Sequence, residues 1–138
     1  MKEIKDLDID SWKFNKKSPE EEYNKPEEHY DKEEIEKYSK SGGMRRAQER
    51  IANRVIEFLR DEKIGRKIGE GRLLDLGCGV GYTASVYREY GYGVIGLDKL
   101  EIMLEKAKEK DLNVKQGDMR DLTEFKRNSF DAVVSASA

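Results

Sequence analysis

A glycine-rich stretch, Leu73–Tyr82, constrains the fold of this chain more than any other feature. Its sequence is LLDLGCGVGY, in which a short apolar run ends in an acid and a glycine then occupies every second position, at Gly77, Gly79 and Gly81. An apolar run of this length is typical of a buried strand, and glycines allow a tight turn whose backbone can approach a ligand closely. A helical pattern follows from Thr83. Strand, glycine turn and helix together predict the first unit of a nucleotide-binding α/β domain.

Length and composition limit the class of protein. The 138 residues are enough for one domain with a sizeable core, and 41% of them are charged. No apolar run approaches the ~20 residues of a membrane span, and the N-terminus lacks the pattern of a signal peptide. The single cysteine, Cys78, cannot form an internal disulfide, and one His with one Cys does not supply the ligands of a zinc site. We therefore expect a cytoplasmic protein that has no metal site of its own and does not contact a membrane.

The charge distribution bears on nucleic-acid binding. The formal net charge is -2. Residues 1–40 hold 9 Lys or Arg against 13 Asp or Glu, and residues 41–138 hold 18 against 16. A contact with nucleic acid must therefore come from a local basic patch rather than from the charge of the whole chain.

The chain divides into three expected segments. Residues 1–26 are polar and dense in charge, which predicts a flexible charged arm. Residues 27–71 are predicted to form a helical segment that covers the ligand site, and residues 72–138 an α/β core. In the helical segment, Asp31 followed by Glu34 is typical of a helix N-terminus and predicts a helix from about Lys32 to Ser39, which the glycines at 42 and 43 end.

The region from Met44 to Arg60 has the clearest helical periodicity. Its predicted apolar stripe consists of Met44, Ala47, Ile51, Val55, Phe58 and Leu59. Arg46, Arg50 and Arg54 recur four residues apart on another face. Such a row is either a solvated face or a stripe that contacts phosphates, and the spacing leaves both interpretations open.

Beyond residue 71 the hydrophobic period changes to that of strands. The predicted strands are Arg72–Leu76, Gly93–Leu97, Asn113–Lys115 and Phe130–Ser135, with helices at Tyr82–Tyr90 and Leu100–Lys110. Strands that alternate with helices of this length predict right-handed crossovers and a mostly parallel sheet. The chain stops directly after the fourth strand.

The spacing of the glycines narrows the choice of nucleotide. In the dinucleotide fingerprint the third glycine falls three residues after the second, a position that Tyr82 occupies here. The pattern of Asp75–Gly81 is instead D-x-G-x-G-x-G. In this it resembles the class I S-adenosylmethionine-dependent methyltransferases, whose fold is a Rossmann-like α/β sandwich.

Further acids follow at the places that this resemblance requires. Asp98 ends the second strand, where its carboxylate can accept two hydrogen bonds from a ribose diol; the alternative is that it caps the next helix. Asp118 follows the third strand, and in the family pattern this acid accepts from the adenine amine; the alternative is a turn aspartate. The segment 128–135 resembles the family's fourth motif, which ends at Ser135 beside the methionine moiety and the methyl acceptor.

The resemblance implies a set of cofactor contacts: Asp75, Gly77, Cys78, Gly79, Gly81, Asp98, Lys99, Asp118, Met119, Ser135 and Tyr38. The stem of Lys99 could cover one face of the adenine. Tyr38 is a candidate contact for the methionine end, against the alternative of a tyrosine that packs between helices. Cys78 is interpreted as a small buried residue of the turn and not as a nucleophile. No catalytic residue is assigned.

The N-terminal half is similar to one branch of this family, the small-subunit ribosomal RNA guanine-N7 methyltransferases of eukaryotes and their archaeal relatives. The similarity starts at Pro26 and includes Met44, Gln48, Arg50 and Ala52. It implies methyl transfer to a guanine N7 of ribosomal RNA, with S-adenosyl-L-homocysteine as product. It also implies a possible partner, a small zinc-binding activator protein that pairs with the sheet edge.

Two departures from the branch concern the cofactor pocket, because Gly43 replaces a basic residue and Lys99–Glu101 replaces an apolar residue followed by Ser-Pro. Two other functions stay open at this point. One is a small-molecule methyltransferase, since such enzymes share all four motifs. The other is a cofactor-binding module without activity on its own, because family members continue with about three more strands and we expect the sheet to be truncated after the fourth.

Overall fold

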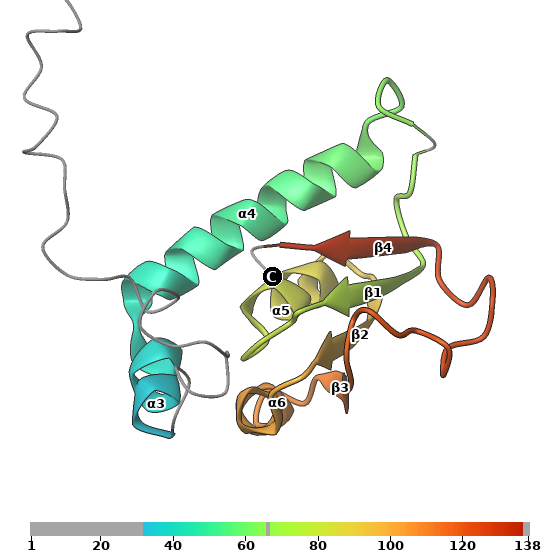
Figure 1. Cartoon of the computed structure of the whole chain (residues 1–138). Coiled ribbons are helices and arrows are strands. Elements are labelled where there is room, and N and C mark those ends of the chain that lie inside the picture. Colours follow the sequence, from blue (N-terminus) through green and yellow to red (C-terminus); the bar gives the residue numbers. More distant parts are fainter. Residues whose placement is uncertain (1–31, 66, 137–138) are drawn as a thin grey trace, which may run out of the picture. The chain divides into compact units, whose positions relative to one another are not determined.

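The computed structural model describes residues 32–65 and 67–136 (Figure 1). The predicted arm, residues 1–26, and the predicted cap Asp31 lie outside this part of the chain. Four helices and four strands are described. They are α3 (Lys32–Lys40), α4 (Gly42–Arg60), β1 (Arg72–Leu76), α5 (Tyr82–Glu89), β2 (Gly93–Asp98), α6 (Glu101–Lys108), β3 (Asn113–Gln116) and β4 (Ala132–Ser135).

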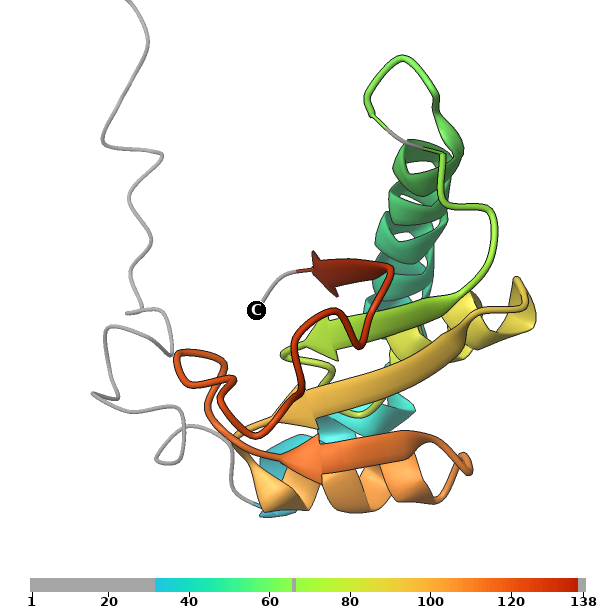
Figure 2. The same ribbon diagram turned by 90° about the vertical axis from the view of Figure 1, so that its right-hand side faces the viewer.

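The four strands form one parallel sheet in the order β3-β2-β1-β4. Parallel neighbours cannot be joined by a hairpin, so α5 and α6 provide the crossovers from β1 to β2 and from β2 to β3. Figure 2 shows α4, α5 and α6 on one side of the sheet, with the connection from β3 to β4 on the other. The predicted α/β class with a parallel sheet is confirmed.

The register brings the carboxyl ends of the strands together at one edge. Leu76 of β1 pairs with Leu97 of β2 and with Ser135 of β4, and Asp98 pairs with Gln116 of β3. The strand order reverses beside β1, because β2 and β3 follow on one flank while β4 lies on the other. In open α/β sheets, ligands bind outside the carboxyl ends of the strands at such a switch point.

The core lies between the sheet and the helices on one face. A cluster of buried side chains joins α4, α5, β1 and β4, and its members are Ala52, Ile56, Leu73, Val86, Tyr87, Tyr92 and Val134. A second cluster, formed by Ala84, Ala107 and Leu112, joins α5 to α6. Both clusters share the partly buried Val94 of β2, so the three helices pack on one continuous apolar face.

The glycines at 42 and 43 do not end α3, and this part of the prediction is wrong. Ser41 separates the two helices with an extended backbone, and its hydroxyl accepts a hydrogen bond from the amide of Met44 at 3.3 Å. A serine in this position is an N-cap. The glycines are therefore the first residues of α4.

The apolar stripe predicted for α4 is rotated from the face that packs. Ala52 and Ile56 are buried against the sheet, whereas Met44 and Phe58 are 40% and 46% exposed. Val55 and Leu59 of the predicted stripe pack at the margin of the core. Periodicity finds a stripe on a helix, but which side meets the sheet depends on how the helix lies on it.

The fourth strand begins at Ala132 and not at Phe130. Asp131 precedes it and fixes its start, because the Asp131 carboxylate accepts from the Arg72 amide and the Asp131 amide donates to the Arg72 carbonyl, both at 2.8 Å. Phe130 instead packs edge-to-face on Phe125 with ring centroids 5.6 Å apart. Within the described residues, no helix has the length and apolar character needed to cross a membrane.

Candidate functional site

The glycine turn is hydrogen-bonded to the end of β2. The amides of Gly77 and Cys78 both donate to the carbonyl of Leu97, at 2.8 and 3.1 Å. Gly77, Gly79 and Gly81 have φ values of 70°, 54° and 93°, in the left-handed region that side chains disfavour. The turn therefore needs glycine at alternate positions for its backbone conformation, as the sequence indicated.

Two of these glycines have different surroundings. A Cβ added to Gly81 would lie 2.3 Å from Cδ1 of Leu112, so the turn is tightly packed on that side. A Cβ added to Gly79 would meet nothing within 4 Å. The backbone at Gly79 is thus open to an approaching group, which is the property that a ligand-binding turn requires.

Asp98 connects the end of β2 to the glycine turn. One carboxylate oxygen, Oδ2, accepts from the amide of Gly79 at 2.8 Å, and the other, Oδ1, accepts from the amide of Leu100 at 2.9 Å. The second bond holds the residue just before α6, but the N-cap of that helix is Leu100 and not Asp98, so the helix-capping alternative is wrong. A carboxylate has about four acceptor positions, so this one can still accept from two hydroxyl groups.

Asp75 lies behind the turn. It is 1% exposed, and its Oδ2 accepts from the hydroxyl of Thr83, at the start of α5, at 2.8 Å. Burial raises the pKa of this carboxyl group to about 7, against the effect of the Thr83 hydrogen bond, and the charge of Asp98 raises it further. Its contact in the structure is thus with α5, and a direct contact with a ligand stays a prediction.

Asp118 forms an ion pair at the end of β3. Its two carboxylate oxygens accept from Nε of Arg120 at 3.0 and 3.1 Å, and Nη2 of Arg120 also donates. The Arg120 guanidinium and the Arg120 amide hold the pKa of this carboxyl well below its usual range. Arg120 is a partner that the sequence reasoning missed, and an adenine amine would have to share the carboxylate with it.

The remaining predicted residues lie along the same edge. Cys78 is buried against Gly96, where an added Cβ would lie 2.6 Å from the sulfur, and desolvation raises the pKa of the thiol. Ser135 donates its hydroxyl to the carbonyl of Leu76 at 3.1 Å. Lys99 and Met119 are exposed at the ends of β2 and β3. The side chain of Tyr38, on α3, is outside the described residues.

A pocket at the turn includes a residue that the sequence reasoning did not place in the site. Gln48 of α4 lines it together with the turn and the start of α5, and the full lining is Gln48, Gly77, Cys78, Gly79, Val80, Tyr82, Thr83 and Ala136. Gln48 is one of the residues that resemble the ribosomal RNA branch, and this resemblance could have indicated that it belongs to the site. Helix α4 thus reaches the glycine turn, while the covering role of residues 27–71 stays a prediction. Among the described residues, no group of three or more His, Cys, Asp or Glu side chains is arranged to hold a metal ion.

Comparison with known proteins assigns this arrangement. Residues 74–138 match the family model described as a methyltransferase domain. This part of the chain is therefore similar to methyltransferase domains, in agreement with the resemblance of the glycine turn to the class I, S-adenosylmethionine-dependent type. The match begins within β1 and includes the glycine turn, Asp98 and Asp118.

The methyltransferase domain and the helices before it also resemble individual proteins. The chain is 32% identical over 118 residues to the 18S rRNA (guanine-N(7))-methyltransferase of Bos taurus, a match that covers 82% of this chain and 40% of the relative. It is 34% identical to the probable 18S rRNA (guanine-N(7))-methyltransferase of Dictyostelium discoideum, over 82% of this chain and 39% of that relative. The chain thus spans about 40% of the length of these curated relatives.

A solved structure agrees on the fold. The crystal structure of the PH0226 protein of Pyrococcus horikoshii superposes with a TM-score of 0.56 and 29% identity, covering 68% of this chain and 40% of that one. The predicted fold is therefore supported by a solved structure, and the resemblance to the ribosomal RNA branch is supported by sequence.

The residues of the site fit the cofactor that this class uses. S-adenosylmethionine offers a ribose diol, and the lone pairs left on the Asp98 carboxylate are acceptors for two hydroxyl groups. The open backbone at Gly79 leaves room beside that carboxylate. A ribose bound there would lie at the edge where β1 and β2 end, as the switch-point rule expects.

Proposed function

We propose that this methyltransferase domain binds S-adenosylmethionine at the carboxyl ends of β1 and β2, and that it serves the methylation of a guanine N7 in small-subunit ribosomal RNA. The observation that supports the first part most directly is the bond from the Gly79 amide to the Asp98 carboxylate, which joins the open turn to a ribose acceptor. The second part rests on the relatives, which are named as 18S rRNA (guanine-N(7))-methyltransferases.

Each residue of the site has a distinct task in this proposal. Asp98 accepts from the ribose hydroxyls, and the turn at Gly79 leaves its backbone open to the ligand. Asp118 accepts from the adenine amine while Arg120 keeps the carboxylate ionised. Ser135, at the end of β4, lies on the side where the methionine end and the acceptor are expected.

Methyl transfer to a guanine N7 does not require a general acid or base from the protein. S-adenosylmethionine, when bound, supplies a methyl group on a sulfonium that a nucleophile can attack in line. A guanine N7 carries no proton at neutral pH, so it needs no general base. The protein then contributes by holding the two reactants in line and by excluding water.

Replacement of Asp98 tests the cofactor site. Asp98→Asn keeps the shape and one acceptor oxygen but removes the charge, and hydrogen bonds to charged groups are worth about 1.5–3 kcal/mol each. We expect the dissociation constant for S-adenosylhomocysteine, measured by titration calorimetry, to rise at least roughly a hundredfold. Glu105→Gln removes the same charge from the exposed side of α6 and is the matched control. Equal affinities of wild type and Asp98→Asn would refute the ribose assignment.

The arginine row on α4 distinguishes ribosomal RNA from a small-molecule substrate. Arg54 pairs with Glu57 and lies 4.6 Å from the ring centre of Phe58. Arg46 and Arg50 are exposed, and neither has an acidic partner among the described residues. They are the part of the row that can contact phosphates, and this supports an RNA ligand.

Charge reversal at Arg46 and Arg50 is the corresponding experiment. If the row binds RNA, the double variant should bind small ribosomal subunits at least roughly tenfold more weakly, with a smaller salt dependence than the wild type. Affinity for S-adenosylhomocysteine should not change and serves as the internal control. Unchanged RNA binding would favour a small-molecule substrate.

A small zinc-binding activator that pairs with the sheet edge is a further part of the proposal. Its support is that β4 pairs only with β1 in the described sheet and that Val133 is 55% exposed. Methyl transfer from labelled S-adenosylmethionine to ribosomal subunits, with and without the candidate activator, tests this partner. It also tests the alternative that the chain is a module without activity on its own. A cytoplasmic location stays a prediction of the sequence.

A further inference from the structure

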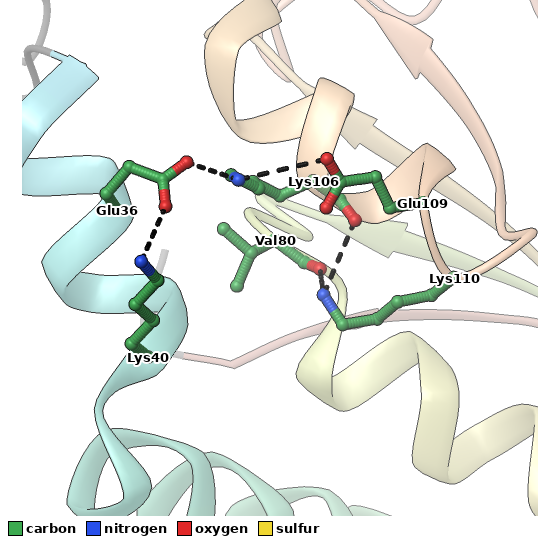
Figure 3. A network of polar contacts seen from close by, with 6 residues as sticks. All are labelled: Glu36, Lys40, Val80, Lys106, Glu109 and Lys110. Atoms are coloured by element: carbon green, nitrogen blue, oxygen red, sulfur yellow. Dashed lines mark hydrogen bonds and ion pairs between the residues drawn. The ribbon is translucent and has the colours of Figure 1, made fainter.

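Lys110, which lies two residues beyond the C-terminal end of α6, contacts the glycine turn. Its Nζ donates to the carbonyl oxygen of Val80, 30 residues away in sequence, at 2.7 Å (Figure 3). It also donates to the carbonyl of Lys106 at 3.4 Å, at the C-terminal end of α6. The turn is thus linked through one side chain to the C-terminal end of α6.

The surroundings of this contact make it stronger than a surface hydrogen bond. Val80 is 1% exposed, and the Lys110 ammonium is partly buried and lies 5.3 Å from the ring centre of Tyr82. Partial burial lowers the pKa of Lys110. A charged donor in a partly desolvated site forms a short and strong hydrogen bond, and the Val80 carbonyl would lose its ammonium donor if Lys110 were replaced.

The chain segment around Lys110 holds the turn at a second point. Leu112 packs against Gly81, where even a Cβ would clash. Arg88 of α5 donates to the carbonyls of Lys110 and Asp111, at 2.9 and 3.2 Å, and so ties this segment to the helix that the turn begins. Lys110 is therefore held in place by its own backbone neighbours.

Val80 lies between Gly79 and Gly81, two glycines that give the turn its conformation. Gly79 and Gly81 have left-handed φ values of 54° and 93°, and glycine loses more conformational freedom on ordering than any other residue. A donor on the Val80 carbonyl fixes the peptide plane between Val80 and Gly81. Fixing that plane also limits the orientation of the Gly79 amide, which binds Asp98.

We propose that Lys110 is a positioning residue for the cofactor-binding turn: its ammonium holds the Val80 carbonyl so that the turn is ordered before the ligand arrives. This role rests on the proposed function. The ligand is the adenosyl cofactor class, and Lys110 acts on it only through the turn. If the turn is ordered in the free protein, no binding free energy is lost in ordering it, and the ligand binds more tightly.

The test compares lysine variants of the full 138-residue chain with S-adenosylhomocysteine as the probe. Lys110→Met removes the donor but keeps most of the apolar stem, and we expect its dissociation constant to rise roughly tenfold. Lys108→Met makes the same change at an exposed position of α6 and should bind as the wild type does. Lys110→Arg restores a cationic donor and should recover most of the affinity.

The outcomes separate a positioning role from a structural one. Loss of affinity in Lys110→Met with recovery in Lys110→Arg supports the proposal. A lower melting temperature with unchanged affinity would overturn it, because Lys110 would then only stabilise the fold. If Lys110→Met does not fold, Lys110→Gln takes its place under the same criterion. Absence of binding by the wild type would overturn the proposed function itself, whereas wild-type binding with unchanged affinity in every Lys110 variant would overturn only the role of Lys110.

Discussion

Asp75 makes the stability of the domain depend on pH in an unusual direction. Its carboxyl group has a pKa of about 7 in the folded protein, because burial disfavours the charge, against a usual value of 3.8 in the unfolded chain. The folded state therefore binds the proton more tightly than the unfolded state does. Between about pH 4 and pH 7 the folded state still holds a proton that the unfolded state has released, so the contribution of Asp75 to the free energy of unfolding falls as the pH rises.

The size of this contribution follows from the two pKa values. The difference between about 7 and 3.8 corresponds to about 4 kcal/mol of stability that is present below pH 4 and lost above pH 7. The Thr83 hydroxyl, which donates to Asp75 at 2.8 Å, already offsets part of the desolvation cost. Asp75→Asn stays neutral at every pH and keeps an oxygen that can accept from Thr83.

We therefore expect the free energy of unfolding to change with pH differently in the wild type and in Asp75→Asn. Free energies of unfolding come from urea denaturation followed by circular dichroism between pH 4 and pH 8, after a check that unfolding is two-state. The free energy of unfolding of Asp75→Asn, relative to that of the wild type, should rise by about 4 kcal/mol as the pH increases across this range. Burial of the side-chain amide in this variant would add a cost that is the same at every pH and would not change this rise. Parallel curves for the two proteins would refute the reasoning.

Two variants sharpen this experiment. Glu105→Gln removes an exposed carboxylate from α6 and should give a curve parallel to that of the wild type. Thr83→Val removes the hydrogen bond that lowers the pKa of Asp75, so the pH at which stability levels off should move upward. A carbon-detected titration of the Asp75 carboxyl group would measure the same pKa directly.

Two further predictions concern packing at and behind the turn. Gly81→Ala should lower the free energy of unfolding by at least about 2 kcal/mol in denaturant melts, because alanine is strained at φ 93° and its Cβ would lie 2.3 Å from Cδ1 of Leu112. Adding Leu112→Ala to this variant should relieve the clash but not the backbone strain. Full recovery of stability in the double variant would contradict the argument from backbone strain. Tyr87→Phe should leave stability unchanged or raise it by up to about 1 kcal/mol, because the buried Tyr87 hydroxyl has no hydrogen-bond partner among the described residues; a clear loss of stability in the same assay would contradict this.

The sequence predicted those parts of the fold that local pattern decides. The strand Arg72–Leu76 and the start of the helix at Tyr82 are confirmed to the residue, because an apolar run and three left-handed glycines leave little freedom. The same holds for the positions of Asp98 and Asp118 at strand ends, which follow once the strands are placed. These features need no knowledge of what lies across the sheet.

The parts that could not be predicted depend on contacts between distant segments. The face of α4 that packs is set by how the helix lies on the sheet, so Met44 and Phe58 were assigned to the core and are exposed. The bond from Lys110 to the Val80 carbonyl joins residues that are 30 positions apart in the sequence. No periodicity in sequence marks such partners.

Asp98 shows why two functional interpretations of one residue need not exclude each other. A structural role and ribose binding were the two interpretations. The bond from the Leu100 amide uses one lone pair of Oδ1 and the bond from the Gly79 amide uses one of Oδ2, so acceptor positions remain for a ribose. The carboxylate is therefore fixed by two backbone amides before any ligand binds. With the Gly77 amide held by Leu97, the glycine turn is anchored to β2 at both ends of its open segment. A ligand meets an acceptor and an open backbone that are already in place, so affinity at this site should depend on the residues that hold the turn as much as on those that touch the ligand.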